Sequence, residues 1–407
     1  MRRGALALTA LLALAGCSPR ETPPQAPVPA RYLYVWSGTG HGTGGSNFIA
    51  VLDVRPESPT YGQIVGASPA VEGGMMPHHT EFILPASGTY FANDFMAGKN
   101  FLVDASSPES PRVTPAPNVA SGFRGPHSFK RLDASRVLMT LQFGDSARAG
   151  NPGGLALVDS AGNVLRASSS FDSAFPKAAI RTYAIEALPG IDRALTTSSP
   201  MDSEHTADVV QVWRLSDLTL LKTIPLPGLA GDSVERYPFE VRAMEDGKTL
   251  LLNSYYCGFY RIAGLDSAEP TVELVLSMRE PRRIGCSVPL VLGKFWIMPI
   301  AYAHTIVTLD ISDPAHPVEV AAFPTDTTFF PHWVAADPGS DRLVLTEQGD
   351  GPPRVLMVRL DRATGRLSWD ERFRDADSTA RGVSFSRARW PNGVTGHAMP
   401  HGALFVP

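Results

Sequence analysis

The sequence predicts an all-β chain that folds as a seven-bladed β-propeller. Seven segments recur along the chain, and most of them share one pattern, in which a short strand leads through a turn, such as Glu-Asp-Gly-Lys, into a second strand. A third strand follows most of them and a fourth follows some, so the unit recurs every roughly 45 to 70 residues, as four-stranded propeller blades do. The seven segments begin at Pro77, Pro126, Tyr183, Tyr237, Gly285, Pro331 and Pro400.

The two ends of the chain each hold part of one blade. The last unit stops after one strand, "HGALFVP", whereas the segment that begins near residue 32 supplies three strands, "RYLYVWSG", "SNFIAVLDV" and "GQIVGAS", without a leading one. Joined, the two parts make one complete blade, and closing the ring in this way removes exposed sheet edges. A two-domain β-sandwich protein is the structural alternative, but it would not predict this complementarity.

The composition is that of a globular protein and gives no sign of a nucleic-acid partner. Of the 407 residues, 43% are hydrophobic and 19% are charged, which suits a chain with a large buried core. The net charge is −4 and no long basic run occurs. We therefore expect no nucleic-acid partner, because binding a phosphate backbone requires a basic surface.

The N-terminus is predicted to direct the protein out of the cytoplasm. Residues 1–17 contain two arginines, an apolar run and small residues before a cysteine, which is the layout of a secretory signal peptide. The sequence Leu-Ala-Gly-Cys ending at Cys17 resembles the lipobox of bacterial lipoproteins, in which the cysteine is lipidated; an ordinary signal peptide is the alternative. Residues 18–31 are Pro-rich and suit a flexible tether. We expect residues 32–407 to form a periplasmic or cell-envelope propeller, lipid-anchored to a membrane through Cys17.

Two further cysteines, Cys257 and Cys286, lie in the propeller region. An oxidising compartment permits a disulfide between them. Pairing requires Cα atoms within about 7 Å of each other, which the sequence does not reveal. The pairing therefore stays open at this point.

Histidines recur at the start of the leading strands. In a propeller the first strand of each blade lines the central channel, so the residues at its start lie near one mouth of that channel. The strands that begin with Pro-His belong to the sixth, seventh, first and second blades, which are neighbours around the ring. We therefore expect the repeat to gather these imidazoles on one side of the channel: His78, His79, His127, His332 and His401. The other blades offer Glu186, Glu240 and Cys286 near the equivalent point.

Converging neutral imidazoles predict a metal site, because histidine binds copper, zinc and iron well. A single histidine at a strand start is more often a structural hydrogen-bonding group, but four neighbouring strands in phase favour ligation. Glu81 follows the His-His pair closely. It could fix a histidine tautomer as a hydrogen-bond acceptor, or simply pair with an arginine or lysine.

Several stretches resemble the selenium-binding protein and methanethiol oxidase family. "PHHTEFILPASGTYFANDFMAGKNFLVDASSPESPRV" is similar to the family segment in which a His-His pair precedes a strand, and "GPHSFKRLDASRVLMTLQFGDSARAGNPGGLALVD" is similar to its Pro-His-Thr segment. "VVQVWRLSDLTLLKTIPLPG" and "ERYPFEVR" resemble two further stretches of the family. The resemblance covers most of the chain in order, whereas the Pro-His phase alone is shared with lactonase-type propellers.

The resemblance implies a copper-dependent oxidase that converts a small thiol such as methanethiol into an aldehyde, hydrogen sulfide and hydrogen peroxide. By position, His78, His79 and His127 match the histidines proposed to hold the metal in that family, and His332 and His401 fit through their phase. The family's cysteine-rich run is absent from "TEFILPASG", which argues against cysteine-based selenium binding here. Zinc or iron in place of copper stays open.

Three functions remain open from the residues alone. The first is a copper oxidase of a small-molecule sulfur substrate, for which Glu81, Glu240 and Glu186 are proton-transfer candidates by location. The second is a lactonase-like hydrolase; no Gly-x-Ser-x-Gly elbow is present, so hydrolysis would depend on a metal or on His and Glu. The third is a non-catalytic binding or scaffold propeller at the membrane. The sequence indicates neither a protein partner nor an oligomeric state.

Overall fold

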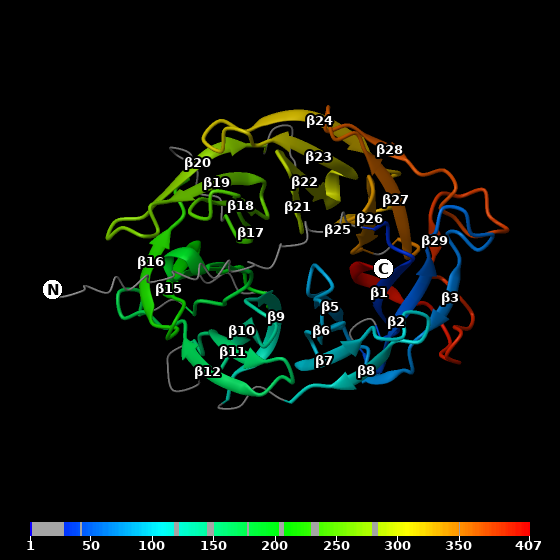
Figure 1. The fold of residues 1–407 in the computed structure, drawn as a ribbon, viewed down its shortest axis with the longest axis horizontal. Helices are drawn as coiled ribbons and strands as arrows, with labels where there is room; N and C mark the ends of the chain where they lie inside the picture. The colour runs from blue at the N-terminus through cyan, green and yellow to red at the C-terminus, as the bar shows by residue number, and fades with distance from the viewer. Residues whose placement is uncertain are drawn as a thin grey trace.

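The computed structural model forms a ring of seven antiparallel sheets, which confirms the predicted seven-bladed propeller (Figure 1). Cys17, the predicted signal peptide from its second residue and most of the predicted tether lie outside the described residues. No helix in the described part of the chain is long and apolar enough to cross a membrane. The structure describes residues 1, 28–40, 43–117, 122–144, 150–176, 179–202, 207–228, 236–278, 284–349 and 351–407.

The first four blades follow one another along the chain. The first consists of β5 (Pro77–Thr80), β6 (Thr89–Asp94), β7 (Lys99–Asp104) and β8 (Arg112–Pro115). The second consists of β9 (Arg124–Arg131), β10 (Arg136–Phe143), β11 (Gly154–Asp159) and β12 (Val164–Ser169). The third consists of β13 (Ile185–Leu188), β14 (Arg193–Thr197), β15 (Val209–Arg214) and β16 (Leu220–Pro225). The fourth consists of β17 (Pro238–Ala243), β18 (Leu250–Ser254), β19 (Gly258–Ala263) and β20 (Thr271–Ser277).

The last three blades complete the ring. The fifth consists of β21 (Leu290–Leu292), β22 (Phe295–Ile300), β23 (Thr305–Asp310) and β24 (Val318–Pro324). The sixth consists of β25 (Pro331–Ala336), β26 (Arg342–Glu347), β27 (Arg354–Leu360) and β28 (Leu367–Trp369), with β29 (Val383–Ser384) also paired to β27. The seventh consists of β30 (Met399–Val406), β1 (Tyr32–Gly38), β2 (Gly45–Asp53) and β3 (Ile64–Ala67), with β4 (Val71–Gly73) also paired to β2. Two three-residue 3₁₀ turns are η1 (Pro189–Ile191) and η2 (Ala301–Ala303).

The seventh blade joins the two ends of the chain, as their complementary strands predict. β1 pairs antiparallel with β30, and Tyr32 lies opposite Val406. Figure 1 shows the C-terminal end inside the ring beside β1. The inner edge strand of this blade therefore comes from the end of the sequence and its other strands come from the beginning.

Each blade is a meander because the residues between its strands favour tight turns. Between β17 and β18 the Asp246 carboxylate accepts hydrogen bonds from the backbone N–H groups of Lys248 and Thr249. Gly247 has a φ of 65°, which costs glycine little because it has no Cβ. This turn directs the chain from the channel outward.

The core is divided among the interfaces between blades. The described residues form seven hydrophobic clusters, and each contains side chains from two neighbouring blades. The strands are rich in Val, Ile, Leu and aromatic residues, which pack well from the pleated faces of both sheets. The ring is held together by this packing as well as by the closing strand.

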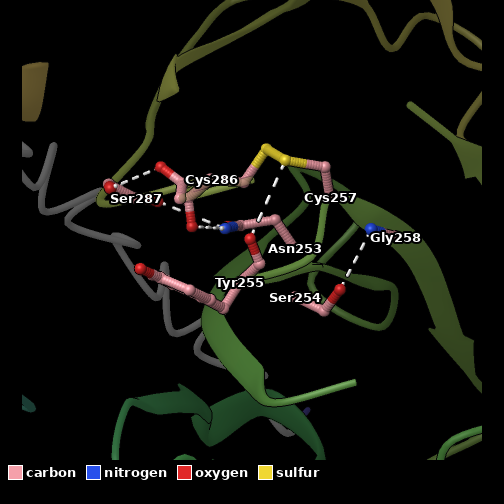
Figure 2. The surroundings of a disulfide bond; sticks show 8 residues. Asn253, Ser254, Tyr255, Cys257, Gly258, Cys286 and Ser287 are labelled. Carbon is pink, nitrogen blue, oxygen red and sulfur yellow. Dashed lines mark hydrogen bonds between the residues drawn. A yellow bond between two sulfur atoms is a disulfide. The ribbon is translucent and has the colours of Figure 1, made fainter. Parts of the chain in front are cut away.

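A disulfide settles the pairing that the sequence leaves open. Cys257, in the turn between β18 and β19, is bonded to Cys286, which precedes β21 (Figure 2). Their Cα atoms are 5.2 Å apart, and both residues are fully buried. Asn253 Nδ2 donates to the Cys286 carbonyl oxygen at 3.0 Å. The bond therefore ties the fourth blade to the start of the fifth.

Candidate metal centre

Four neighbouring inner strands carry the histidines of the predicted site. They are β25, β30, β5 and β9, which supply His332, His401, the pair His78 and His79, and His127, respectively. All five side chains are buried, with exposed fractions between 0% and 4%.

Side chains on the second strand of a blade hydrogen-bond to the inner strand of the next blade and fix its register. Asn93 Nδ2 of the first blade donates to the His127 carbonyl oxygen at 2.8 Å. Thr346 Oγ1 of the sixth blade donates to the His401 carbonyl oxygen at 2.5 Å. These bonds cross from each blade to the next, so the inner strands are held in a common register around the channel.

The five imidazole rings form one contiguous cluster. The ring centroid of His78 lies 4.3 Å from that of His79 and 4.4 Å from that of His401. His127 lies 4.3 Å from His79, and His332 lies 4.7 Å from His401. The structure therefore brings together all five histidines that the sequence predicts to converge.

Burial keeps these imidazoles neutral. It lowers the pKa of His127 and of His332 to about 3. It also lowers the pKa of His78, His79 and His401 far below the usual range, and the neighbouring imidazoles act in the same direction. A neutral imidazole is the form that binds a metal.

Hydrogen bonds to Ser128 and to the Tyr183 backbone orient two of the rings. His127 Nδ1 lies 3.0 Å from the Tyr183 carbonyl oxygen and 3.0 Å from Ser128 Oγ. A carbonyl oxygen can only accept, so Nδ1 carries the proton and Nε2 keeps its lone pair. His79 Nδ1 also lies 3.0 Å from Ser128 Oγ. Metal-binding histidines are commonly held in this way through their second nitrogen.

Ring nitrogens of three of the histidines lie close enough together to hold a metal ion after small side-chain shifts. His78 Nε2 lies 2.8 Å from His127 Nε2, and one ligand nitrogen each from His78, His79 and His127 lie within 4.8 Å of one another. Two nitrogens bound to one ion at about 2.0–2.1 Å are separated by roughly 3–4 Å. Buried nitrogens of four of the histidines have no hydrogen-bond partner among the described residues: His78 Nδ1, His79 Nε2, His332 Nε2, and both ring nitrogens of His401. Leaving such groups unpaired is costly, so the donor set suits a bound cation.

The glutamates predicted as proton carriers have other partners. Glu81 forms an ion pair with Arg131 at 2.6 Å and accepts from the Phe91 N–H, so it takes the salt-bridge role of the two that the sequence allows. Glu240 is fully buried and paired with Arg242 at 2.7 Å. Burial raises the pKa of Glu240, and its Oε1 has no partner among the described residues.

In the three blades without Pro-His strands, the residues that take the place of the histidines are not the ones that the sequence suggests. Thr140 and Thr197 donate to the carbonyl oxygens of Tyr183 and Phe239, as Asn93 does to His127. Asn253 Nδ2 lies 3.2 Å from the Ser287 carbonyl oxygen. Tyr183, Phe239 and Ser287 therefore hold the equivalent places, instead of Glu186, Glu240 and Cys286. Glu186 instead pairs with Lys130, and Cys286 offers no thiolate because it is in the disulfide.

The structure adds residues around the cluster that the sequence pattern did not single out. Tyr183 lies against His127 with ring centroids 3.7 Å apart, and Trp333 contacts His79 at 5.3 Å. Ser128 and Trp333 each directly follow a Pro-His pair, so the same repeat could have identified them. Tyr183 has no Pro-His signal.

The other described histidines lie apart from the cluster. His304 Nδ1 lies 2.9 Å from the Phe329 carbonyl oxygen, and His316 pairs with Asp313 on the surface. His397 is exposed and hydrogen-bonded to a serine of the same surface segment. His41 and His205 lie outside the described residues.

Comparison with known proteins supports the fold. No family model matches the sequence, and no curated protein matches it. A hypothetical selenium-binding protein from Sulfolobus tokodaii is similar in structure, with a TM-score of 0.73 and 15% identity over 93% of this chain and 94% of that one. The periplasmic gluconolactonase PpgL of Pseudomonas aeruginosa has a TM-score of 0.63 and 14% identity, over 92% and 99% of the two chains. A protein from Lactobacillus plantarum has a TM-score of 0.59 and 12% identity, over 93% and 100%. At these identities the chain shares the propeller fold with all three.

Proposed function

We propose that the protein binds one copper ion among its five clustered histidines and uses it to oxidise a small thiol. The observation that carries this proposal is the cluster of buried, neutral imidazoles, four of which have a ring nitrogen without a hydrogen-bond partner among the described residues. His78, His79 and His127 would hold the metal, because one ligand nitrogen from each lies within 4.8 Å of the others. His332 and His401, which lie beside these three residues, would supply further ligands to the metal.

The chain's own residues would prepare the site for this chemistry. The Tyr183 carbonyl oxygen and Ser128 would hold His127 and His79 with their ligand nitrogens directed inward. Trp333 would limit water access from the far side of the cluster, since it is fully buried against His79. Copper, when bound, would supply thiolate binding and electron transfer to dioxygen. Glu240 could hold a proton near the channel because burial raises its pKa, whereas the ion pair with Arg131 leaves Glu81 less suited.

Metal content is the first test of this function. The full chain would be produced with copper, zinc and iron available and analysed by elemental mass spectrometry. We expect about one copper per chain, lost in the His79→Ala/His127→Ala double variant and retained in a His316→Ala control, because His316 is an exposed residue paired only with Asp313 in the described structure. Copper-loaded protein given methanethiol and dioxygen should then oxidise the thiol to formaldehyde and hydrogen sulfide, with water consumed and dioxygen reduced to hydrogen peroxide. Folded protein without metal would instead leave a binding or scaffold propeller as the better account.

A lactonase-like hydrolase is the second candidate. The observation in its favour is the structural likeness to a periplasmic gluconolactonase. The same purified samples can be assayed with gluconolactone. Gluconolactone turnover by samples that release no hydrogen peroxide when given methanethiol and dioxygen would favour hydrolysis over thiol oxidation.

We also propose that the protein is lipid-anchored at the cell envelope through Cys17. The disulfide between Cys257 and Cys286 is consistent with an oxidising compartment. The Ala30 N–H donates to Asp337 Oδ1 at 3.0 Å, so a tether would join the ring beside the turn between β25 and β26. Metabolic labelling with an alkyne fatty acid should mark the protein, and a Cys17→Ser variant should lose the label.

A further inference from the structure

The N-terminal segment is fixed to the ring just before β1. The Ala30 N–H donates to Asp337 Oδ1 at 3.0 Å, and the Ala30 carbonyl oxygen accepts from Arg342 Nη2 at 3.2 Å. Asp337 and Arg342 are themselves a buried ion pair of the sixth blade. Val28 is the first described residue of this segment and is 64% exposed. The chain that precedes Val28 therefore joins the ring at a defined place.

This place is on the side of the ring away from the histidines. The inner strands β25 and β30 begin at the cluster, with His332 and His401, and end at the opposite side. Asp337 directly follows β25, and the next residue, Pro338, lines a cavity of about 620 Å³. Residues on or directly after the inner strands of all seven blades line this cavity, so it lies on the axis of the ring. The residues that line it form the distal face of the ring.

The chain between Cys17 and the ring is too short to bring the histidine side against a membrane. Val28 is eleven positions after Cys17, and a Pro-rich chain of this length spans roughly 34 Å. A path from the axis to the outside of the ring crosses four strands, about 14 Å, and a strand of eight residues such as β30 adds about 25 Å. That path is longer than the chain, even before side chains are included. An anchor at Cys17 therefore holds the distal face toward the membrane.

The distal face carries a run of five consecutive apolar residues in the loop between β5 and β6. This apolar loop, residues 82–86, has the sequence Phe-Ile-Leu-Pro-Ala, and all five residues line the cavity. None of the five is fully buried, and Ile83 is 78% exposed. Phe82 stacks on Trp333 with ring centroids 4.6 Å apart, which fixes the base of the loop. An exposed apolar run of this length is typical of a surface that contacts an apolar partner.

The charged side chains that line the cavity are paired. Lys130 forms an ion pair with Glu186, and Arg242 forms one with Glu240 at 2.7 Å. The distal face therefore offers no excess charge that would select an anionic or a cationic partner. Its apolar groups must supply the contact, so the charge of the lipid head groups should matter little.

We propose that the apolar loop of the distal face lies against the lipid surface of the membrane that holds the anchor. This inference depends on the proposed anchor at Cys17. The short tether keeps the ring at a high effective concentration near the lipid, which strengthens even a weak contact. Ile83 and Leu84 enter the interface, where burial of their side chains stabilises the contact. The histidine side of the channel then faces the aqueous compartment.

Photo-cross-linking of the lipidated protein in phosphatidylcholine vesicles tests this orientation. The vesicles contain a lipid with a diazirine in its acyl chain, and mass spectrometry identifies the cross-linked peptides. We expect cross-links at residues 82–86 and none above background at Met96, which is 53% exposed in the turn between β6 and β7. Asp94 of β6 lies opposite Pro77 of β5, so Met96 is on the histidine side of the same blade. Met96 is therefore a matched control.

Two variants test the apolar contribution of the loop. Ile83→Asp should lower the yield of cross-links in the loop by about tenfold, because it removes the burial of one isoleucine side chain. Met96→Asp should leave this yield as in the wild type. Vesicles that also contain phosphatidylglycerol should give the same pattern as phosphatidylcholine alone. Circular dichroism and thermal melting would verify that each variant is folded.

Three results would each overturn the proposal: cross-links at Met96 in place of residues 82–86, an unchanged yield in Ile83→Asp, or an anchored protein without cross-links in the loop. A chain that the cell does not lipidate would refute the anchor alone. A chain produced from Cys17 onward would then be coupled to a maleimide lipid in the same vesicles. Cys257 and Cys286 are bonded to each other, so Cys17 is the remaining thiol of the three cysteines in the sequence. The coupled chain has the same tether, and the same pattern of cross-links is expected from it.

Discussion

Replacing Cys257 and Cys286 together by alanine is expected to lower the free energy of unfolding by about 3.5 kcal/mol. The bond closes a loop between residues 29 apart in the sequence. Restricting a loop of this length in the unfolded chain contributes about 3–4 kcal/mol in the chain-entropy model. For a chain of 407 residues this corresponds to a melting temperature lower by roughly 4 °C.

Urea unfolding followed by tryptophan fluorescence measures the loss in free energy, and alkylation with mass spectrometry verifies the bond. Denatured, unreduced wild type should leave Cys257 and Cys286 unlabelled, and reduction should expose both thiols. Wild type reduced before unfolding should approach the stability of the double variant. This comparison separates the effect of the bond from that of the alanine side chains, since the reduced protein keeps both sulfurs.

Two results would refute this reasoning. Both thiols labelled in unreduced, denatured protein would mean that the bond does not form. A double variant within about 0.5 kcal/mol of the wild type would mean that the loop is already restricted in the unfolded chain.

Trp333→Ala should lower the free energy of unfolding by about 3–5 kcal/mol in urea melts, because the indole is fully buried and stacks on Phe82 at 4.6 Å; a loss below about 1 kcal/mol would contradict this packing. Arg342→Met should cost a similar amount. This change leaves the buried Asp337 carboxylate without the guanidinium that lies 2.6 Å away. Adding Asp337→Asn to the same chain should recover part of the lost free energy of unfolding. A double variant whose loss equals the sum of the two single losses would contradict this ion pair. Burial raises the pKa of Glu347 to about 7, so the folded protein keeps a proton that the unfolded chain loses above its ordinary pKa. Stability therefore falls as pH rises from about 4.5 to 7, and Glu347→Gln should gain up to about 3 kcal/mol on the wild type across that interval, as urea melts at both pH values would show. A difference that does not change with pH would refute this assignment.

The repeat made the ring and its histidines predictable. Each blade restarts with the same short strand, so the position of one Pro-His pair gives the position of the next around the channel. The closing blade was predictable for a similar reason, since β30 supplies the one strand that the N-terminal segment lacks. Both inferences depend only on the order of strands along the chain.

The partners of the charged groups were not predictable in this way. Glu81 pairs with Arg131, which is on the next blade, and no spacing rule identifies such a neighbour. The disulfide depends on the distance between two Cα atoms across two blades, which the sequence does not contain. The blade of Tyr183 lacks the Pro-His signature, so the sequence does not identify Tyr183 as the position equivalent to His127. The structure identifies it, because Thr140 donates a hydrogen bond to the Tyr183 carbonyl oxygen.

The closing strand ties the candidate site to the order in which the chain is made. β1 emerges first and β30 last, and His401 lies on β30. Until the final residues have been synthesised, the inner edge of β1 has no partner and the histidine cluster lacks His401. A chain cut short by even one strand would therefore expose an open sheet edge and an incomplete set of imidazoles at the same time. Truncated copies would be recognisable to proteases by the first defect and unable to form the complete cluster because of the second.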